Sequence, residues 1–329
     1  MINNRFKEWI DLAQPRLGAR VVFATDEFFA AKERLIDPQD PVFVADKFDD
    51  HGKWMDGWET RRRRGAGHDY CIVKLGLPGV VKGLDLDTTH FTGNYPPSAS
   101  IDACASAADA PGADAKWDEI HGSVTLLGDA HNYLTIQSER RYTHLRINIY
   151  PDGGIARLRV YGQVQRDWDN VGPDQRIDLL AVENGGRALA CNDEHYGSMH
   201  NLNLPGRGIN MGDGWETRRR REPGNDWVIL TLGHTGVVER IEIDTAHFKG
   251  NYPDRASIQA ARVNGGGIDK LVAQSEGWDL LLPESKLEMD VEHQFQEQVR
   301  EIGAINHVRL NIFPDGGVSR LRLFGRISR

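Results

Sequence analysis

The chain has 329 residues, of which 27% are charged and 40% are hydrophobic, and its net charge is −8. At roughly 150 residues per domain, this length predicts two compact domains, and the composition excludes a disordered chain. The net negative charge argues against a nucleic-acid-binding protein, because affinity for phosphates depends on an excess of Lys and Arg.

Targeting signals and cysteine frameworks are not evident in the sequence. No apolar run approaches the roughly 20 residues that cross a bilayer, and the first residues, MINNRFKEWIDLAQ, show no hydrophobic segment with a cleavage site. We therefore expect a cytoplasmic protein with no membrane partner. Cys71, Cys104 and Cys191 lack CxxC spacing, so they are expected to be reduced thiols rather than disulfide or zinc ligands.

Short segments with alternating hydrophobic residues predict antiparallel strands. Such segments lie at 71–75, 84–87, 227–232 and 241–244, separated by Gly- and Pro-bearing stretches that predict turns. Residues 145–149 and 156–160 alternate on either side of PDGG, which predicts a β-hairpin. Helical spacing is scarce, and the best helical candidates are 3–13 and 288–302.

Three segments occur twice in the same order. They are DGWETRRRR at 56–64 and 213–221; DTTHFTGNYP at 87–96 and DTAHFKGNYP at 244–253; and NIYPDGGIARLRVYG at 148–162 and NIFPDGGVSRLRLFG at 311–325. The first two pairs are separated by the same 157 residues, so the repeat is continuous. This pattern indicates a duplicated domain.

The duplication sets the expected domain boundaries. We predict one domain over 1–167 and a second over 173–329, joined by the polar segment 165–175. The first copy has extra residues around 36–50, which we expect to form a surface loop. The strand pattern predicts that each copy is an antiparallel β-sandwich of the jelly-roll type.

ATDEFFA (24–30), GWETRRRR, DTTHFTGNYP and, in the second copy, CNDEHYG (191–197) with NLNLPGRGINMGDGWETRRRR together resemble the allantoicase family over nearly the whole chain. The resemblance implies an all-β protein with two tandem jelly rolls of the galactose-binding-like type, short helices and homo-oligomeric assembly. It also implies hydrolysis of allantoate to ureidoglycolate and urea in purine (allantoin) catabolism. The alternative is a non-enzymatic carbohydrate-binding protein that presents Trp faces to sugars.

Allantoate carries a carboxylate and two ureido groups, so its site needs a cation, amide partners and an acid. If the arginine run is a strand, alternate side chains point the same way. The candidates for a bidentate carboxylate clamp are Arg61, Arg63, Arg218 and Arg220. For each of them, a salt bridge with a surface acid is the alternative.

The other charged and aromatic residues of this motif have expected structural roles. Glu59 and Glu216 are flanked by arginines, so we expect depressed pKa values and structural salt bridges rather than general acids. Trp58 and Trp215 are expected to be packing anchors of the sheet.

His90 and His247 are the catalytic candidates of the second duplicated segment, because imidazole titrates near neutrality. The alternative is that their rings bond to local backbone groups. Asn94 and Asn251 are candidates for binding urea amides, and a turn-forming Asn at positive φ explains them equally well. We expect the second copy to contribute more, because more polar groups surround His247.

Paired acids precede the arginine motif in both copies. In the second copy Asp193 and Glu194 are candidate catalytic acids, and His195 is a candidate substrate contact. Such acids also bind divalent cations, so Mn²⁺ or Ca²⁺ is a candidate cofactor, and the metal ligands stay undefined. The spacing of His195 and His200 matches no zinc signature. The alternative is that Asp193 caps a turn beside an exposed Glu194.

Overall fold

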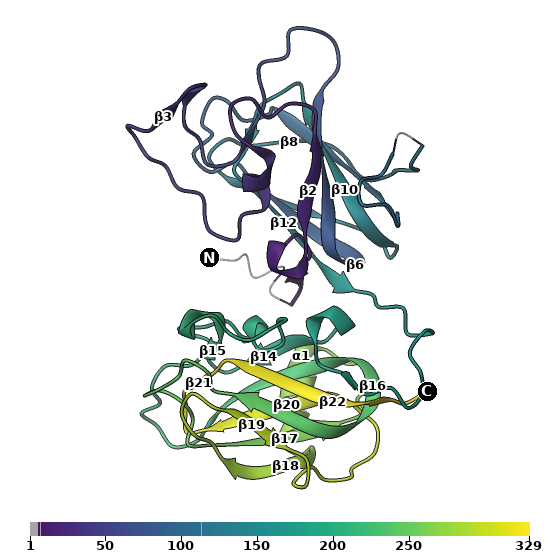
Figure 1. Cartoon of the computed structure of the whole chain (residues 1–329), viewed down its shortest axis with the longest axis vertical. Coiled ribbons are helices and arrows are strands. Elements are labelled where there is room, and N and C mark those ends of the chain that lie inside the picture. The colour runs from purple at the N-terminus through teal and green to yellow at the C-terminus, as the bar shows by residue number, and fades with distance from the viewer. Residues whose placement is uncertain (1–5, 7, 113) are drawn as a thin grey trace. The chain divides into compact units, whose positions relative to one another are not determined.

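The computed structural model describes residues 6, 8–112 and 114–329. The chain divides into two compact units, Met1–Gln165 and Arg166–Arg329. Each unit consists mainly of antiparallel strands with a few short helical turns, as Figure 1 shows. The prediction of two tandem antiparallel β-sandwiches is confirmed.

The strands of the first unit are β1 (Ile10–Asp11), β2 (Arg20–Ala24), β3 (Phe48–Asp49), β4 (Gly52–Lys53), β5 (Trp58–Glu59), β6 (Asp69–Asp87), β7 (Ser98–Cys104), β8 (Asp118–Thr125), β9 (His131–Thr135), β10 (Arg141–Tyr150), β11 (Gly154–Ile155) and β12 (Arg157–Val164). One layer holds β2, the first part of β6, β10, β7 and β8. The other layer holds β1, β12, the second part of β6 and β9. The pairs β5–β11 and β3–β4 lie outside this sheet path.

β6 belongs to both layers because it is 19 residues long. Its residues 69–74 pair with β2 and β10, and its residues 79–87 pair with β12. The two short strands predicted at 71–75 and 84–87 are therefore one strand, and the turn expected between them was wrong. A Cβ at Gly79 would lie 2.4 Å from the carbonyl oxygen of Gln163, so glycine here permits the close approach of β12.

The predicted hairpin between 145–149 and 156–160 was also wrong. β10 lies between β6 and β7, whereas β12 lies between β6 and β1. The PDGG segment passes from one layer to the other, and its β11 pairs with β5 of the arginine motif. Alternation identified both strands correctly, but it carries no information about which strand each one pairs with.

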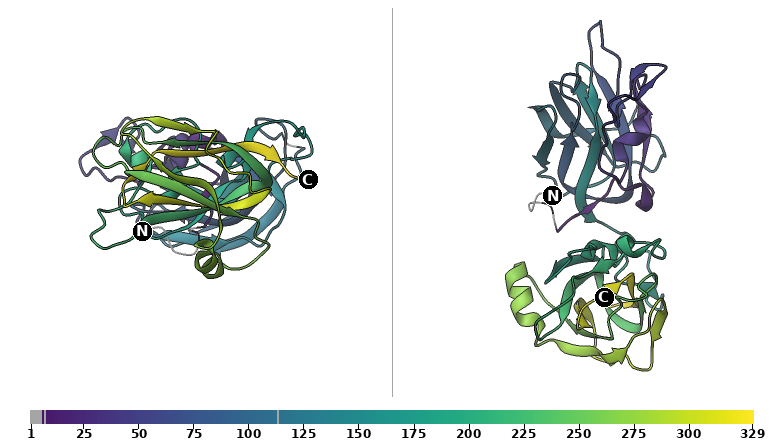
Figure 2. Two further views of the ribbon diagram at one scale, coloured as in Figure 1. Left: turned by 90° about the horizontal axis from the view of Figure 1, so that it is seen from below. Right: turned by 90° about the vertical axis from the view of Figure 1, so that its left-hand side faces the viewer.

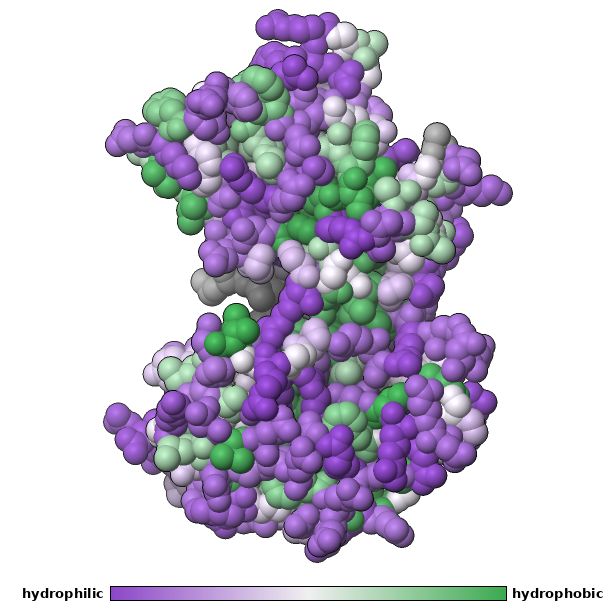
Figure 3. Space-filling view, viewed as in Figure 1, coloured by the Kyte–Doolittle hydropathy of each residue, from purple (hydrophilic) through white to green (hydrophobic). Residues whose placement is uncertain are grey.

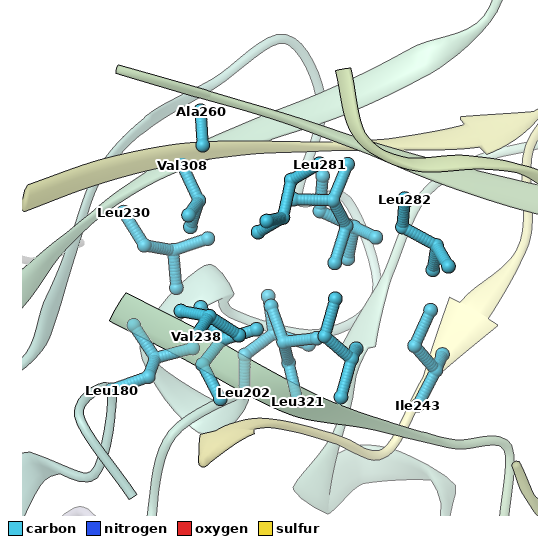
Figure 4. Packing of buried hydrophobic residues seen from close by; sticks show 14 of the residues in the cluster. Leu180, Leu202, Leu230, Val238, Ile243, Ala260, Leu281, Leu282, Val308 and Leu321 are labelled. Atoms are coloured by element: carbon cyan, nitrogen blue, oxygen red, sulfur yellow. The ribbon is translucent and has the colours of Figure 1, made fainter. Parts of the chain in front are cut away.

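The second unit repeats this plan with β13 (Ile177–Asp178), β14 (Arg187–Cys191), β15 (Trp215–Glu216), β16 (Asp226–Asp244), β17 (Arg255–Ala261), β18 (Asp279–Lys286), β19 (Glu292–Phe295), β20 (Ile305–Phe313), β21 (Gly317–Val318) and β22 (Arg320–Ile327). β16 pairs with β14 and β20 and then with β22 and β19, as β6 does in the first unit, so 227–232 and 241–244 are also one strand. Figure 4 shows fully buried Leu230 and Val308 on one side of the core and Leu321 on the other.

Both helical predictions were wrong. Residues 288–302 form β19 and turns, and β19 pairs with β16. Residues 8–13 form β1 and a turn, whereas 3–5 and 7 lie outside the described residues. Strand pairing overrides weak local helix propensity at both places. The α-helix that the described residues do contain is α1 (Ile268–Ser275), visible beside the strands of the second unit in Figures 1 and 2.

The extra residues of the first unit form an exposed loop, as expected. Phe43 and Phe48 are 51% and 68% exposed. The loop is also anchored, because the carbonyl oxygen of Gln39 accepts a hydrogen bond from buried Arg157 at 2.8 Å.

Hydrophilic side chains dominate the viewed surface of each unit in Figure 3. Within the described part of the chain, no helix is both long and apolar enough to span a membrane.

Candidate functional site

The three duplicated segments meet at one place in each unit. In the first unit, Glu59 of β5 pairs with Gly154 of β11, and its backbone also exchanges hydrogen bonds with Ala30. The amide of Gly154 donates to the carbonyl oxygen of Asn94 at 2.7 Å. Backbone bonds to two neighbouring segments therefore fix the position of Glu59. In the second unit, Glu216 is held in the same way.

A pocket opens beside each of these glutamates, and we call the two the glutamate pockets. The first, of about 480 Å³, is lined by Phe29, Glu59, Thr60, Arg62, Arg63, Gly93, Asn94, Tyr95, Pro97, Pro151, Asp152 and Gly153. The second, of about 540 Å³, is lined by Tyr196, Glu216, Thr217, Arg219, Gly250, Asn251, Tyr252, Asp254, Pro314, Asp315 and Gly316. The repeat thus builds the same polar pocket twice. Phe29 and Pro97 of the first are replaced by Tyr196 and Asp254 in the second.

The glutamate of the first pocket is a buried acid with one amide partner. Glu59 is 9% exposed, and its Oε1 accepts a hydrogen bond from Nδ2 of Asn94 at 2.8 Å. Burial raises the pKa of Glu59 above its ordinary value, and the Asn94 hydrogen bond offsets only part of that effect. The predicted salt bridge and depressed pKa of Glu59 were wrong: Arg61 and Arg63 pair with other acids, and burial raises the pKa. Asn251 donates to Glu216 in the second pocket.

The arginine run is an extended loop rather than a strand, since β5 ends at Glu59. Arg61 pairs with Asp26 at 2.6 Å, and Arg63 pairs with Asp69 at 2.8 Å. In the second unit, Arg218 pairs with Asp193 at 2.7 Å and Arg220 pairs with Asp226 at 2.8 Å. All four predicted substrate clamps therefore already hold a carboxylate of the protein.

The arginines between these pairs are free. Arg62 and Arg219 are exposed and make no hydrogen bond or ion pair with any described residue, and each lines a glutamate pocket. Each also lines a second, smaller pocket formed largely by the arginine run itself, of about 370 Å³ for Arg62 and about 470 Å³ for Arg219. A guanidinium without a protein partner is available to a carboxylate ligand.

His90 and His247 support loops. Their backbones have φ of 71° and 72°, and each backbone N–H donates to a carboxylate, of Asp129 and Asp290 respectively. The ring Nε2 lies 3.3 Å from the carbonyl oxygen of Pro41 in His90 and 2.8 Å from that of Gly208 in His247. Neither residue lines a glutamate pocket. Their part in proton transfer stays a prediction.

The two asparagines lie in the glutamate pockets, and neither has the positive φ that the sequence suggested as an explanation. Asn94 and Asn251 each line a glutamate pocket and donate to its glutamate. The positive-φ explanation was wrong, because the non-glycine residues with positive φ in these segments are the two histidines.

The paired acids of the second unit accept hydrogen bonds from backbone N–H groups near the arginine motif. Asp193 accepts hydrogen bonds from the backbones of His195 and Arg218, and Glu194 accepts one from Met199. His195 is exposed and packs edge-on against Tyr196. Across the residues that the structure describes, no group of three or more His, Cys, Asp or Glu side chains is arranged to hold a metal. The roles predicted for Asp193, Glu194 and His195 in catalysis or binding stay predictions.

Three pocket residues were missed as functional candidates: Glu59, Arg62 and Asp152. Asp152 lines the first glutamate pocket and accepts a hydrogen bond from the backbone of Arg63. A signal was present, because the duplicated motif has more arginines than nearby acids, and within the described residues Arg62 and Arg64 are left without an ion-pair partner. The packing-anchor prediction for Trp58 and Trp215 is confirmed, since both are 0% exposed.

Comparison with known proteins decides the family. Residues 10–165 and 177–328 each match the family model described as "Allantoicase repeat". The chain belongs to the allantoicase family. It is 59% identical over 322 residues to a probable allantoicase 2 of Burkholderia pseudomallei, covering 98% of this chain and 96% of that protein. It is 58% identical to a probable allantoicase of Ralstonia nicotianae, covering 98% and 96% respectively.

Solved structures of allantoicases share the fold. The crystal structure of the Saccharomyces cerevisiae allantoicase matches with a TM-score of 0.79 and 37% identity, covering 96% of this chain and 92% of that one. A second allantoicase structure matches with a TM-score of 0.80 and 36% identity, covering 97% and 93%. The expectation of an allantoicase-type tandem repeat is therefore confirmed.

Proposed function

We propose that this protein is an allantoicase, hydrolysing allantoate to ureidoglycolate and urea, and that the chemistry takes place in the glutamate pocket. Family membership over nearly the full chain supports the reaction. The observation that supports the location is that each repeat joins its three duplicated segments around a glutamate, an asparagine and an unpaired arginine.

The chemistry of the pocket suits the parts of allantoate. Arg62 has no partner among the described residues, so its planar guanidinium can bind the substrate carboxylate through two hydrogen bonds. The carboxylate of Asp152 lines the same pocket and offers an acceptor for ureido N–H groups. Phe29 covers one side with an apolar ring.

Glu59 is the proposed acid. Because burial raises its pKa, the protonated form persists to a higher pH than that of an exposed glutamate. The Glu59 proton passes to one ureido nitrogen as the bond from that nitrogen to the central carbon breaks, which releases urea. Water then forms the new C–O bond and returns a proton to Glu59, so ureidoglycolate is formed and the acid is regenerated.

Asn94 is a positioning residue in this scheme. Its Nδ2 holds Oε1 of Glu59 at 2.8 Å, which leaves the second carboxyl oxygen for the substrate. Asn251 holds Glu216 in the second pocket.

The carbohydrate-binding alternative has less support. It relies on tryptophan faces against sugars, yet the tryptophans of the duplicated motif, Trp58 and Trp215, are 0% exposed. A divalent cation, a homo-oligomeric assembly and a cytoplasmic location remain proposals from the sequence.

The test follows urea release from allantoate by the purified, metal-stripped protein, with and without added Mn²⁺ or Ca²⁺. We expect turnover by the wild-type protein and a loss on the order of 10²-fold in Glu59→Gln, because a general acid is removed. Glu119→Gln changes an exposed glutamate of the first unit and is the matched control. Absence of urea under every condition refutes the activity, and full activity of Glu59→Gln refutes the location.

A further inference from the structure

One face of the sheet is covered by a helix in the second repeat and by a loop that leaves a cavity in the first. In the second repeat α1 lies against β14 and β16, where its Leu271 packs with Leu189 and Ile229. These three side chains are 7%, 8% and 0% exposed, and Trp227 and Trp278 pack around them. The helix thus closes this face with an apolar contact.

An arginine beneath the helix is also covered. The side chain of Arg309 is 5% exposed, and its guanidinium stacks over Trp227 at 4.7 Å. Its Nη1 donates to Oγ of Ser275 at 2.8 Å, and its Nη2 lies 3.6 Å from a carboxylate oxygen of Glu276. α1 therefore supplies both the apolar cover and the acceptor oxygens for this arginine.

The first repeat keeps the arginine and the aromatic side chains without the helix. Arg146, Tyr70 and Trp117 stand at the positions of Arg309, Trp227 and Trp278 by strand register. The described residues between β7 and β8 contain no helix. A cavity of about 270 Å³ remains there, lined by Val22, Phe23, Tyr70, Ile72, Trp117 and Arg146 among others, and we call it the aromatic pocket. The Arg146 side chain is 30% exposed, against 5% for Arg309.

Arg146 is held in a fixed orientation with one nitrogen to spare. Its guanidinium lies over Trp117 at 4.9 Å and over Tyr70 at 5.6 Å. Nε and Nη2 both donate to Oδ2 of Asp102, at 2.9 and 2.8 Å. Nη1 has no hydrogen-bond partner among the described residues, whereas Nη1 of Arg309 donates to Ser275.

The acids near Arg146 and Arg309 differ, and this difference indicates which kind of acceptor would suit Nη1 of Arg146. Arg309 has Gln259 at the position of Asp102, and its carboxylate neighbour is Glu276 of α1. In the first repeat, Asp102 already neutralises Arg146. The two N–H groups of Nη1 can therefore bind an acceptor oxygen that brings no further negative charge, which favours a carbonyl over a carboxylate.

We propose that the aromatic pocket is a binding site for a small, neutral, planar ring that carries a carbonyl group, such as a lactam or cyclic ureide. The ring packs against Phe23 and the part of Trp117 that the Arg146 guanidinium does not cover, and the carbonyl oxygen accepts from Nη1 of Arg146. The volume of about 270 Å³ lies below the roughly 300–1,000 Å³ of pockets that hold drug-sized ligands, which suits a single ring. This site is separate from the glutamate pocket, because the two share no lining residue.

The experiment is a ligand-observed NMR titration of the full-length protein with 2-pyridone, a planar six-membered lactam. We expect a Kd on the order of 1 mM or lower, given the small size of the ligand. Trp117→Leu removes the stacking surface, and Val22→Phe fills the cavity from its wall. Each is expected to raise the Kd at least about 10-fold, and Trp278→Leu, the same change in the covered face, is expected to leave it unchanged.

Two comparison ligands test the chemistry. δ-Valerolactam keeps the lactam but not the aromatic plane, and benzoate replaces the carbonyl with a carboxylate, so both should bind more weakly. Thermal melts of every variant establish that it is folded. Trp117→Leu removes an aromatic surface and Val22→Phe fills the cavity, so if one of them does not fold, the other still tests the site. The proposal is overturned if 2-pyridone does not bind, if a folded pocket variant binds like wild type, or if benzoate binds more tightly.

Discussion

In the first repeat the pocket glutamate, Glu59, is 9% exposed and has a raised pKa, whereas its counterpart Glu216 is only partly buried. Beneath both pockets the scaffold is the same. Asp56 pairs with fully buried Arg157 at 2.7 Å, and Asp213 pairs with Arg320 at 2.7 Å. Duplication has kept the ion pair that joins the first and last duplicated segments, while the pocket linings have diverged.

The largest expected effect concerns this shared scaffold. Asp56→Ala leaves the Arg157 guanidinium buried without its carboxylate, and breaking such a pair costs about 3–5 kcal/mol of unfolding free energy. Asp213→Ala should cost a similar amount, because Arg320 is equally buried, with both arginines 2% exposed. Chemical denaturation measures both variants. If either variant lost less than about 1 kcal/mol of unfolding free energy, the two ion pairs would not stabilise their repeats equally.

The second prediction concerns the difference between the two glutamates. If burial makes Glu59 the acid, Glu59→Gln should lower kcat on the order of 10²-fold, and Glu216→Gln should lower it far less. The kcat of the wild-type protein should fall as pH rises through the pKa of Glu59, because the protonated form is the catalytic acid. The Glu216→Gln variant should show the same decline. Equal losses in both variants would replace the asymmetry with a composite site. A larger loss in Glu216→Gln would favour the second repeat, which the sequence predicts as the major contributor.

The sequence was sufficient for the repeat and the fold class. The duplicated letters mark the segments that converge around Glu59, and alternation marked the strands. The sequence did not predict which strands pair. β10 and β12 were predicted to form a hairpin, although each pairs with β6. The two short runs in β6 read as separate strands because glycines that permit close packing also resemble turn residues.

The candidate site was harder to predict because side-chain pairing depends on contacts between distant segments. Arg61 and Arg63 looked available, yet Asp26 and Asp69 occupy them. Glu59 looked like a salt-bridge partner, and only the tertiary fold reveals its burial.

The third prediction tests the free arginine against a paired one. Arg62→Gln should raise KM for allantoate about 10-fold with little change in stability, because the described residues give Arg62 no partner to lose. Arg61→Gln should leave KM near the wild-type value, since Arg61 is held by Asp26. Steady-state kinetics on both variants decides the assignment. A larger increase of KM in Arg61→Gln would instead support Arg61 as the carboxylate clamp, as the sequence analysis predicts.

The smallest expected effect lies away from the pocket, at a buried acid of the first repeat. Asp85 is 3% exposed, and its Oδ2 lies 2.7 Å from Nδ1 of His131. Its Oδ1 has no hydrogen-bond partner in the part of the chain that the structure describes. Burial raises the pKa of Asp85 to about 6, against the opposing effect of His131. The counterpart in the second repeat, Glu242, is paired with Arg240.

A pKa raised by folding means that protonated Asp85 favours the folded state below the unfolded pKa, near 4, and that this contribution is lost as pH rises through about 6. Asp85→Asn removes the buried charge, so it should stabilise the protein by about 1 kcal/mol at pH 8 and not at pH 4, because the lost His131 contact offsets part of the relief. Glu242→Gln should give no gain at pH 8, since it leaves Arg240 without its partner. Thermal melts at the two pH values measure both changes, and a destabilised Asp85→Asn at pH 8 would show that the His131 pair outweighs the burial of the acid.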